Sequence, residues 1–378
     1  MTEGRTRVLQ VLGSSAGGVA RHVAQISAAL ATRTPDGPDL VVSIAGPASV
    51  HRLVAPAEGQ MPFRAIPLGA RPGPRDVEVA RRLRVLTARV DVVHAHGLRA
   101  GAAVVVAVAT LRPAERPRVV VTLHNLPVGG RGVRMVSTAL EWLVARRADV
   151  VLGVSGDLVE RARTRGARRA ERALVPAPAR PPIRRTSAVV RADLGLDPAA
   201  ALLVTVARLA PQKGLDLLCD VAGLLRDRID SGDLPGRHRL VWAVAGDGPL
   251  LGHVAARVAA EHLPVVLLGH RDDVPDLLAA ADLVVSAAVW EGQPLWLQEA
   301  LALGAAVVAT DVGGTSEVTA DGASLVPAAR PGHLAARIAH LLTDEPRRLA
   351  LGESALERSR ALPTIADVLA QLRSAYSR

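Results

Sequence analysis

The chain has few aromatic residues, and this scarcity bears on its partners. Aromatic side chains make up 2% of its 378 residues. Proteins that bind single-stranded nucleic acids stack the bases on such rings, yet the arginine-rich first half of the chain offers only Phe63 and Trp142. We therefore expect no nucleic acid partner.

Cysteine and long apolar runs are also scarce. The single cysteine, Cys219, has no second thiol to pair with inside the chain, which is typical of proteins in reducing compartments. The longest apolar run, Ala100 to Leu111, is far shorter than the ~20 residues that span a bilayer. The N-terminal stretch lacks an apolar segment of signal-peptide length. We therefore expect a cytoplasmic protein, with Cys219 in a core.

Lysine is nearly absent. Of the 46 basic residues, 45 are arginine and one is Lys213. An ammonium is a compact point charge and a guanidinium is a planar fork, so the two groups are not interchangeable. A lone lysine in such a chain indicates a position that requires an ammonium, with chance as the alternative.

The charge is divided unevenly along the chain. Residues 1–186 contain 29 basic and 13 acidic residues, a net charge of +16, whereas residues 187–378 contain 17 and 23, a net charge of −6. A basic half favours an anionic partner. An anionic membrane surface or a phosphorylated acceptor fits better than nucleic acid. The alternative is that arginine is simply abundant in the source of the protein.

Short runs of Val and Leu alternate with helical patterns along the chain. Such runs are typical of a parallel sheet covered by helices on both faces, and 378 residues suffice for two domains. We predict an α/β fold. The main predicted strands cover residues 7–12, 40–45, 91–94, 118–123, 150–154, 202–206 and 307–310, and the main predicted helices cover 19–32, 75–88, 100–110, 132–147 and 364–377.

A basic, proline-rich segment, residues 161–191, divides the two halves. Its prolines at 176, 178, 181 and 182 exclude a regular helix there, and its composition is that of an interdomain linker. We predict a first domain over residues 1–178, a linker over 179–191 and a second domain over 192–361. We expect hinge motion at residues 176–190.

A glycine loop, GSSAGG at residues 13–18, joins the first predicted strand to the first predicted helix. A glycine loop at a helix N-terminus can cradle a phosphate with its backbone amides. The loop lacks the Gly-x-Gly-x-x-Gly spacing of dinucleotide dehydrogenases, which makes that class less favoured. A tight turn without a ligand is the alternative.

Two motifs in the second half carry charges suited to an elongated anion. In VARLAPQKG, residues 206–214, Arg208 and Lys213 lie beyond a strand end, where two cations can pair with a diphosphate. In EGQPLWLQE, residues 291–299, Pro294 favours a helix start between Glu291 and Glu299. The two carboxylates can hold hydroxyls at two points of one ligand, as in a sugar nucleotide. A surface helix with two solvated carboxylates is the alternative.

This order of motifs resembles family 4 of the retaining glycosyltransferases of the GT-B type, which carry a Glu-x7-Glu signature. The family includes sucrose, phosphatidylinositol mannose and mycothiol-pathway glycosyltransferases. The resemblance covers nearly the whole chain. It implies two Rossmann-like domains that face a cleft, and a last helix, within residues 362–378, that crosses back to the first domain.

The resemblance also implies roles for individual residues. Arg208 and Lys213 would clamp the donor diphosphate, Glu299 would accept from the ribose, and Glu291 from the donor sugar. Gln293, Trp296 and Gln298 depart from the usual pattern and leave the donor sugar open. The implied donor-binding residues are Gly17, Gly18, Arg208, Lys213, Gly246, Arg271, Glu291, Gly292, Glu299, Gly313 and Gly314, and the implied catalytic residues are Arg208, Lys213, Glu291 and His124.

Polar residues at predicted strand ends of the first domain are candidates for the acceptor side. His124 resembles a family histidine that contacts the donor sugar, and His96, Asn125 and Ser155 are the acceptor-side candidates. We expect His94 to be packed and His96 to lie nearer the cleft. No third or fourth ligand stands at zinc spacing, so we predict no metal site.

The resemblance implies transfer of a sugar from a UDP- or GDP-sugar to an acceptor hydroxyl with retention, on a cell-envelope or lipid-linked acceptor. The chain has no Asp-x-Asp, so we predict metal-independent transfer without a cofactor. A sugar-nucleotide epimerase, a phosphorylase and a non-catalytic sugar-nucleotide-binding protein remain alternatives.

Overall fold

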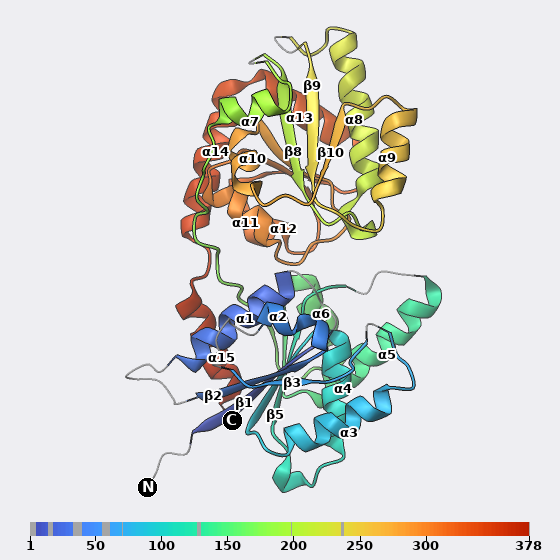
Figure 1. Ribbon diagram of the computed structural model, residues 1–378, viewed down its shortest axis with the longest axis vertical. Helices are drawn as coiled ribbons and strands as arrows, with labels where there is room; N and C mark the ends of the chain where they lie inside the picture. The colour runs from blue at the N-terminus through green and yellow to red at the C-terminus, as the bar shows by residue number, and fades with distance from the viewer. Residues whose placement is uncertain are drawn as a thin grey trace. The chain divides into compact units, whose positions relative to one another are not determined.

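The computed structural model describes residues 5–13, 18–32, 40–54, 61–69, 71–126, 130–197, 199–235 and 238–377. The chain divides into two compact units (Figure 1). Unit 1 comprises residues 1–176 and 363–378, and unit 2 comprises residues 177–362. The chain therefore passes between the units twice.

Unit 1 is built on a sheet of seven parallel strands in the described part of the chain, in the order β3-β2-β1-β4-β5-β6-β7. The strands are β1 (Thr6–Leu12), β2 (Leu40–Gly46), β3 (Phe63–Ala65), β4 (Val92–His96), β5 (Arg118–Leu123), β6 (Val150–Gly153) and β7 (Ala170–Arg172). The helices are α1 (Gly18–Ala31), α2 (His51–Val54), α3 (Asp76–Thr87), α4 (Leu98–Ala109), α5 (Arg131–Arg147), α6 (Gly156–Thr164) and α15 (Ile365–Tyr376).

Unit 2 is built on a sheet of six parallel strands among the described residues, in the order β10-β9-β8-β11-β12-β13. The strands are β8 (Ala201–Val206), β9 (Leu240–Ala245), β10 (Val265–Gly269), β11 (Leu283–Ser286), β12 (Val307–Asp311) and β13 (Ser324–Pro327). The helices are α7 (Ser187–Asp193), α8 (Leu215–Asp230), α9 (Leu251–Ala260), α10 (Val274–Ala280), α11 (Leu295–Ala302), α12 (Thr315–Thr319), α13 (Pro331–Thr343) and α14 (Glu345–Arg360).

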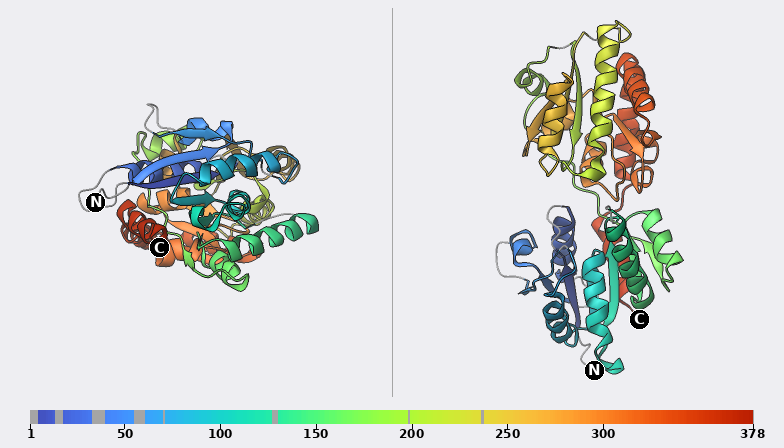
Figure 2. Two further views of the ribbon diagram at one scale, coloured as in Figure 1. Left: turned by 90° about the horizontal axis from the view of Figure 1, so that it is seen from below. Right: turned by 90° about the vertical axis from the view of Figure 1, so that its right-hand side faces the viewer.

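The apolar strands of unit 2 are buried on both faces, as the sequence predicts. Alternate side chains of a strand point to opposite faces of a sheet, so Leu203 packs with α8 and α13, whereas Leu202 packs with α10 and α11. The right-hand view of Figure 2 shows helices on both sides of each sheet. Cys219 lies in the first of these cores, as predicted, and burial raises the pKa of its thiol to about 11.

The last helix, α15, belongs to unit 1, which confirms the predicted return of the chain. Thr364 and Asp367 form a capping box that starts the helix. Its far end is fixed by Arg118, whose Nε donates to the Ala375 carbonyl at 2.6 Å, and Gln371 donates to the Arg172 carbonyl at 2.8 Å. The helix therefore contacts both a central strand and an edge strand.

The segment with the composition of a linker contains more regular structure than its sequence indicates. Residues 161–172 include the end of α6 and the whole of β7, because the prolines begin at 176. At its other end, α7 starts at Ser187, where the Thr186 side chain accepts from the Val189 amide. The stretch between these elements, residues 173–186, forms neither a helix nor a strand.

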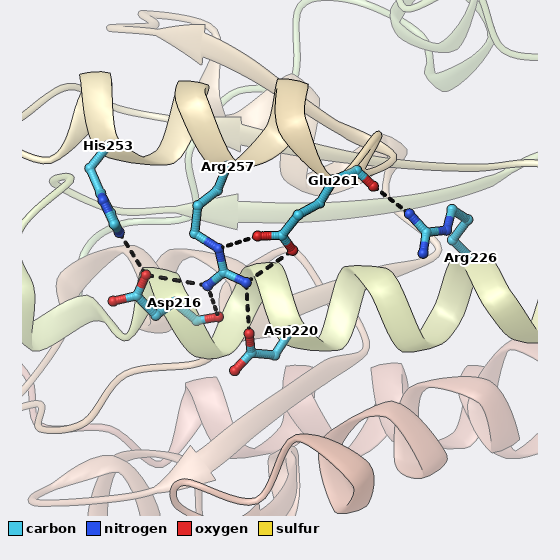
Figure 3. Close-up of polar contacts among 6 residues, drawn as sticks. All are labelled: Asp216, Asp220, Arg226, His253, Arg257 and Glu261. Atoms are coloured by element: carbon cyan, nitrogen blue, oxygen red, sulfur yellow. Dashed lines mark hydrogen bonds and ion pairs between the residues drawn. The ribbon is translucent and has the colours of Figure 1, made fainter.

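A group of ion pairs joins α8 to α9 on unit 2 (Figure 3). Arg257 donates to Asp216 at 3.3 Å, to Asp220 at 2.8 Å and to Glu261 at 2.7 and 3.0 Å. His253 lies 2.8 Å from Asp216. One guanidinium thus connects three carboxylates from two helices.

Replacing Arg257 with methionine should lower the free energy of unfolding by about 1–2 kcal/mol, because several charge-assisted hydrogen bonds are lost at once. Hydrogen bonds from Arg257 lower the pKa of Glu261. A lowered carboxyl pKa stabilises the fold above the ordinary carboxyl range and less below it. The difference from the wild type should therefore shrink as the pH falls below about 4.

Urea denaturation at pH 7 and pH 3.5 measures this effect. Arg228→Met, on the partner helix α8, is the matched control and should change stability by less than about 0.5 kcal/mol. Equal losses in the two variants would show that the ion pairs contribute nothing specific.

Candidate functional site

The sheet of unit 2 reverses its strand order beside β8. The chain proceeds from β8 to β9 and β10 on one side and then returns to β11, β12 and β13 on the other side. The loops after β8 and β11 therefore lead away from each other, which leaves a binding place at the carboxyl ends of these strands. The loop after β8 carries Arg208 and Lys213, and the loop after β11 carries Glu291.

Lys213 and Glu291 are in direct contact at this place. The Lys213 Nζ lies 2.5 Å from the Glu291 Oε1, and the two side chains are 15% and 9% exposed. The residues are 78 positions apart, so the contact is a product of the fold. The ammonium keeps two further N–H donors and the carboxylate keeps a second oxygen for a ligand.

Backbone contacts between the two loops place this pair. The Val289 amide donates to the Gln212 carbonyl at 3.0 Å. Gly214 has a φ of 62°, and a Cβ there would lie 1.9 Å from the Ala287 carbonyl oxygen. Only glycine allows so close an approach in this conformation, so Gly214 fixes the loop that carries Lys213 against the loop that carries Glu291.

The loop after β12 packs against Glu291 from the other side. The Gly314 amide donates to the Glu291 carbonyl at 2.9 Å. Gly313 has a φ of 53°, and a Cβ there would lie 2.0 Å from the same carbonyl oxygen. Gly292 and Gly314 are both buried. The predicted residues Glu291, Gly292, Gly313 and Gly314 are thus brought together.

Arg208 is held by a similar close approach of backbones. Gly246 follows β9, and a Cβ there would lie 1.9 Å from the carbonyl oxygen of Ala207, the residue before Arg208. The Arg208 side chain is exposed and makes no hydrogen bond or ion pair with any residue that the structure describes. This guanidinium is available to a ligand.

Two further donor-side candidates have a less direct relation to the pair. Glu299 lies half-buried on α11, which follows the Glu291 loop. Arg271 donates to Asp273 at 2.7 and 2.6 Å, and this pairing lowers the pKa of Asp273. The Arg271 side chain is therefore engaged within its own loop, which leaves its backbone for a ligand.

The corresponding edge of the sheet in unit 1 carries four histidines. They are His22 on α1, His94 and His96 on β4, and His124 beyond β5. The ring centroids of His94 and His96 are 4.2 Å apart, those of His96 and His124 are 5.5 Å apart, and those of His22 and His124 are 5.8 Å apart. Three of the predicted strand-end residues, His94, His96 and His124, thus form one cluster with His22.

Burial favours the neutral form of all four imidazoles. Burial lowers the pKa of His22 to about 4 and that of His94 to about 3. Burial, reinforced by the neighbouring histidines, lowers the pKa values of His96 and His124 well below the ordinary value. Neutral imidazoles give the cluster one N–H donor and one bare nitrogen per ring.

His96 differs from its prediction. It is 1% exposed, as is His94, whereas we expected it nearer to a cleft. The reason is that β4 is a central strand and that the His96 Nε2 lies 2.8 Å from the Gln10 Oε1 on β1. His124, beyond the end of β5, is the histidine of the cluster that remains partly exposed.

The other candidates of unit 1 are placed as follows. Asn125 is exposed. Ser155 is fully buried at the start of α6, where its hydroxyl donates to Asp157. Its side chain therefore bonds within its own loop. Gly18 is the exposed first residue of α1, and Gly17 lies outside the described residues.

Sequence reasoning missed three participants of the histidine cluster. Gln10 lies within an apolar strand, His22 on an apolar helix face, and Tyr376 on the last helix. Of these three residues, only Gln10 could have been identified from the sequence, because it is a polar residue inside an apolar run. Among the described residues, no group of three or more His, Cys, Asp and Glu side chains is suited to hold a metal ion.

Comparison with protein families agrees with this geometry. A sequence model described as glycosyl transferases group 1 matches residues 200–344, and one described as a glycosyl transferase 4-like domain matches residues 17–178. The two matches cover most of both units.

Solved structures with the same fold are similar over the full chain. HepE of Anabaena, solved in complex with UDP and glucose, gives a TM-score of 0.76 at 19% identity and covers 98% of this chain and 99% of its own. Sucrose-phosphate synthase from Thermosynechococcus elongatus gives a TM-score of 0.75 at 20% identity, with 98% of each chain covered. The predicted GT-B fold is confirmed.

Curated relatives match over shorter stretches. The lipopolysaccharide core biosynthesis mannosyltransferase LpsB of Rhizobium meliloti is 33% identical over 184 residues, which are 47% of this chain and 51% of the relative. D-inositol 3-phosphate glycosyltransferase 2 of Catenulispora acidiphila is 38% identical over 183 residues, which are 45% of this chain and 41% of the relative. These matches therefore span about half of the relatives' own lengths or less.

Replacing Gly313 with alanine should destabilise unit 2 by more than about 2 kcal/mol. The new Cβ would collide with the Glu291 carbonyl, and the alanine backbone would be held at a positive φ that is unfavourable for it. Gly252→Ala on α9 is the matched control. A Cβ there has no neighbour within 4 Å, so this change should stabilise by about 0.5–1 kcal/mol. Urea denaturation measures both, and equal stability of the two variants would contradict the close approach.

Proposed function

This chain belongs to the family 4 glycosyltransferases of the GT-B fold, and from that premise we propose that it transfers a sugar from a nucleoside diphosphate sugar to an acceptor hydroxyl with retention at the anomeric carbon. The observation that carries the proposal is the Lys213–Glu291 contact at the strand reversal of unit 2, beside the exposed Arg208. The site offers cations for a diphosphate and a carboxylate for sugar hydroxyls.

The residues divide the work by their chemistry. Arg208 and Lys213 bind the two phosphates and stabilise the charge that develops as the diphosphate leaves. Glu291 accepts from hydroxyls of the donor sugar, and Glu299 accepts from the ribose. Because Glu291 partly neutralises Lys213 before the donor binds, the exposed Arg208 supplies the first attraction for the diphosphate.

The reaction proceeds on one face of the sugar. The bond between the anomeric carbon and the phosphate oxygen breaks while a bond to the acceptor oxygen forms on the same face. The acceptor proton passes to the leaving phosphate oxygen. This scheme requires neither a metal nor a protein nucleophile, because Arg208 and Lys213 provide the positive charge at the leaving group.

The donor is a UDP- or GDP-sugar in this proposal. The Anabaena structure contains UDP and glucose, and the Rhizobium relative is named a mannosyltransferase. These names favour a hexose donor without selecting one sugar. The departures at Gln293, Trp296 and Gln298 lie on the Glu291 loop and on α11, where the sugar would be selected.

We place the protein in the cytoplasm, in peripheral contact with an anionic membrane that carries a lipid-linked or cell-envelope acceptor. Helix α5 of unit 1 supports this placement. Met135 is 72% exposed and Trp142 is 40% exposed, and the helix carries four arginines. Its one acidic residue, Glu141, is buried and paired with Arg161 and Arg165.

The exposed surface of α5 thus combines apolar side chains with positive charge and carries no acid. Such a surface suits the interface of an anionic bilayer. Among the described residues, no helix is both long and apolar enough to cross a membrane. The contact would therefore be a surface contact.

Nucleotide binding tests the donor half of the proposal. Thermal unfolding is followed with UDP-, GDP- and ADP-sugars and free nucleotides without added metal. A ligand at 100 times its dissociation constant should add about 2.7 kcal/mol of stability. Arg208→Ala and Glu299→Ala should lose most of the shift relative to their own ligand-free unfolding temperatures. Arg228→Ala is the control and should keep it.

Turnover separates the enzyme from a binding protein. Arg208→Ala and Lys213→Ala should lower transfer by about 10²-fold or more, because each cation acts on the leaving group. Unchanged turnover in both variants would remove these assignments. A product formed without any acceptor would favour an epimerase, and dependence on free phosphate would favour a phosphorylase.

Vesicle flotation tests the membrane contact. The protein should float with vesicles of phosphatidylglycerol and phosphatidylcholine and remain unbound with phosphatidylcholine alone. Met135→Asp should reduce flotation severalfold, because it places an acid in the apolar part of the surface. Val77→Asp is the control, because Val77 is 59% exposed and lies in the first turn of α3 between Asp76 and Glu78. Equal flotation of the two variants would exclude α5 as the contact.

A further inference from the structure

The side chain of Gln10 connects two parts of a buried hydrogen-bond network in unit 1. Its Oε1 lies 2.8 Å from the His96 Nε2, and its Nε2 lies 3.1 Å from the Tyr376 hydroxyl. Gln10 is fully buried, and Tyr376 is 7% exposed. The amide thus stands between β4 and the last helix, α15.

The network continues on both sides of the amide. On one side, the His96 Nδ1 lies 3.2 Å from the His124 Nε2. On the other side, the Tyr376 hydroxyl lies 2.8 Å from the His94 Nδ1. The other ring nitrogen of His94, Nε2, lies 2.7 Å from the Thr122 hydroxyl. A continuous chain of hydrogen bonds therefore runs from Thr122 to His124.

The orientation of the Gln10 amide sets the direction of each hydrogen bond toward His124. The Gln10 Oε1 can only accept, so the proton of His96 is on Nε2. Because burial keeps His96 neutral, its Nδ1 is bare and must accept from the His124 Nε2–H. His124 is neutral as well, so its own Nδ1 carries no proton.

The phenol at the other side is compatible with this direction. Tyr376 accepts from the Gln10 amide, so its O–H is left to donate to the His94 Nδ1. The remaining His94 proton, on Nε2, then donates to Thr122. With the Gln10 amide oxygen toward His96 and its nitrogen toward Tyr376, each member of the network has a partner of the opposite kind.

We propose that Gln10 is a positioning residue that fixes the tautomer of His124, so that His124 presents a bare Nδ1 as a hydrogen-bond acceptor at the carboxyl end of β5. The proposal rests on the proposed function for its ligand, a hydroxyl of a bound sugar or polyol. A neutral acceptor nitrogen binds a hydroxyl and gives no attraction to a phosphate.

The surroundings of His124 strengthen this selectivity. The His22 ring lies 5.8 Å from His124 at a steep angle, and burial keeps His22 neutral with a pKa of about 4. The His22 Nδ1 is buried without a hydrogen-bond partner. The histidines beside His124 therefore bring no positive charge, so its bare Nδ1 is suited to a hydroxyl.

Nitrogen NMR of ¹⁵N-histidine-labelled, ligand-free protein tests the tautomer directly, because long-range couplings separate protonated from bare ring nitrogens. His124→Gln and His96→Gln identify the two signals. In the wild type, His124 should carry its proton on Nε2 alone. A proton on Nδ1 of His124 would overturn the proposal.

Variants of Gln10 separate positioning from packing. Gln10→Leu removes the acceptor for His96, so both tautomers of His124 should appear. Gln10→Glu restores an acceptor at that place and should restore the single tautomer. If Gln10→Leu keeps the single tautomer, or if Gln10→Glu shows the same mixture as Gln10→Leu, Gln10 does not set the tautomer.

Tyr376→Phe provides a second, milder variant. It keeps the ring on α15 and removes the hydroxyl that holds the Gln10 amide, so a mixed tautomer is again expected. Ser374→Ala is the matched control, because Ser374 lies on the same helix and accepts from Arg169 without contacting the network. The control should retain the single tautomer, and a mixture there would show that any change in α15 has this effect.

A kinetic readout connects the tautomer with the proposed function. Gln10→Leu should lower kcat for transfer about tenfold, equivalent to one lost hydrogen bond of about 1.4 kcal/mol, while the thermal shift with nucleotide stays unchanged. An unchanged kcat with a mixed tautomer would overturn the link to the ligand. If no nucleotide shifts the wild type, the proposed function fails, and the NMR result stands independently of it.

Discussion

The common direction of the strands in each sheet is the constraint on which the rest of this structure depends. Parallel strands bring all their carboxyl ends to one edge, and side chains distant in the sequence meet there. Lys213 and Glu291 meet in unit 2 although 78 positions separate them. Gln10, His96 and His124 meet in unit 1 for the same reason.

The two units use this edge in different ways. In unit 2 the loops are fixed backbone against backbone, and Gly214, Gly246 and Gly313 stand at the crossings, where a Cβ would lie within 2.0 Å of a carbonyl oxygen. The charged side chains are thus supported by main chain rather than by other side chains. In unit 1 buried side chains support one another through hydrogen bonds. A substitution in the first kind of site disturbs geometry, whereas one in the second kind disturbs proton positions.

The sequence predicted those features that local patterns encode. Apolar runs located the strands, and the glycine and proline that bound α11 placed Glu291 in the loop before it. Motif order and resemblance grouped Lys213 and Glu291 as donor-site residues, whereas their direct contact is visible only in the fold. The network around Gln10 could not be predicted in this way, because its hydrogen bonds join residues up to 366 positions apart. Likewise β7 was missed, because its three residues carry no apolar alternation and depend on pairing with β6.

The position of Tyr376 in the sequence has a consequence for the order in which the protein is made. Residues 177–362, the whole of unit 2, are synthesised after the sheet of unit 1 and before the helix that completes it. The sheet of unit 1 therefore emerges from the ribosome before Tyr376 has been synthesised. At that stage His94 and Gln10 lack the phenol that joins them. Unit 2 can fold while unit 1 still lacks its last helix. The domain that is translated first is therefore the one whose fold is completed last.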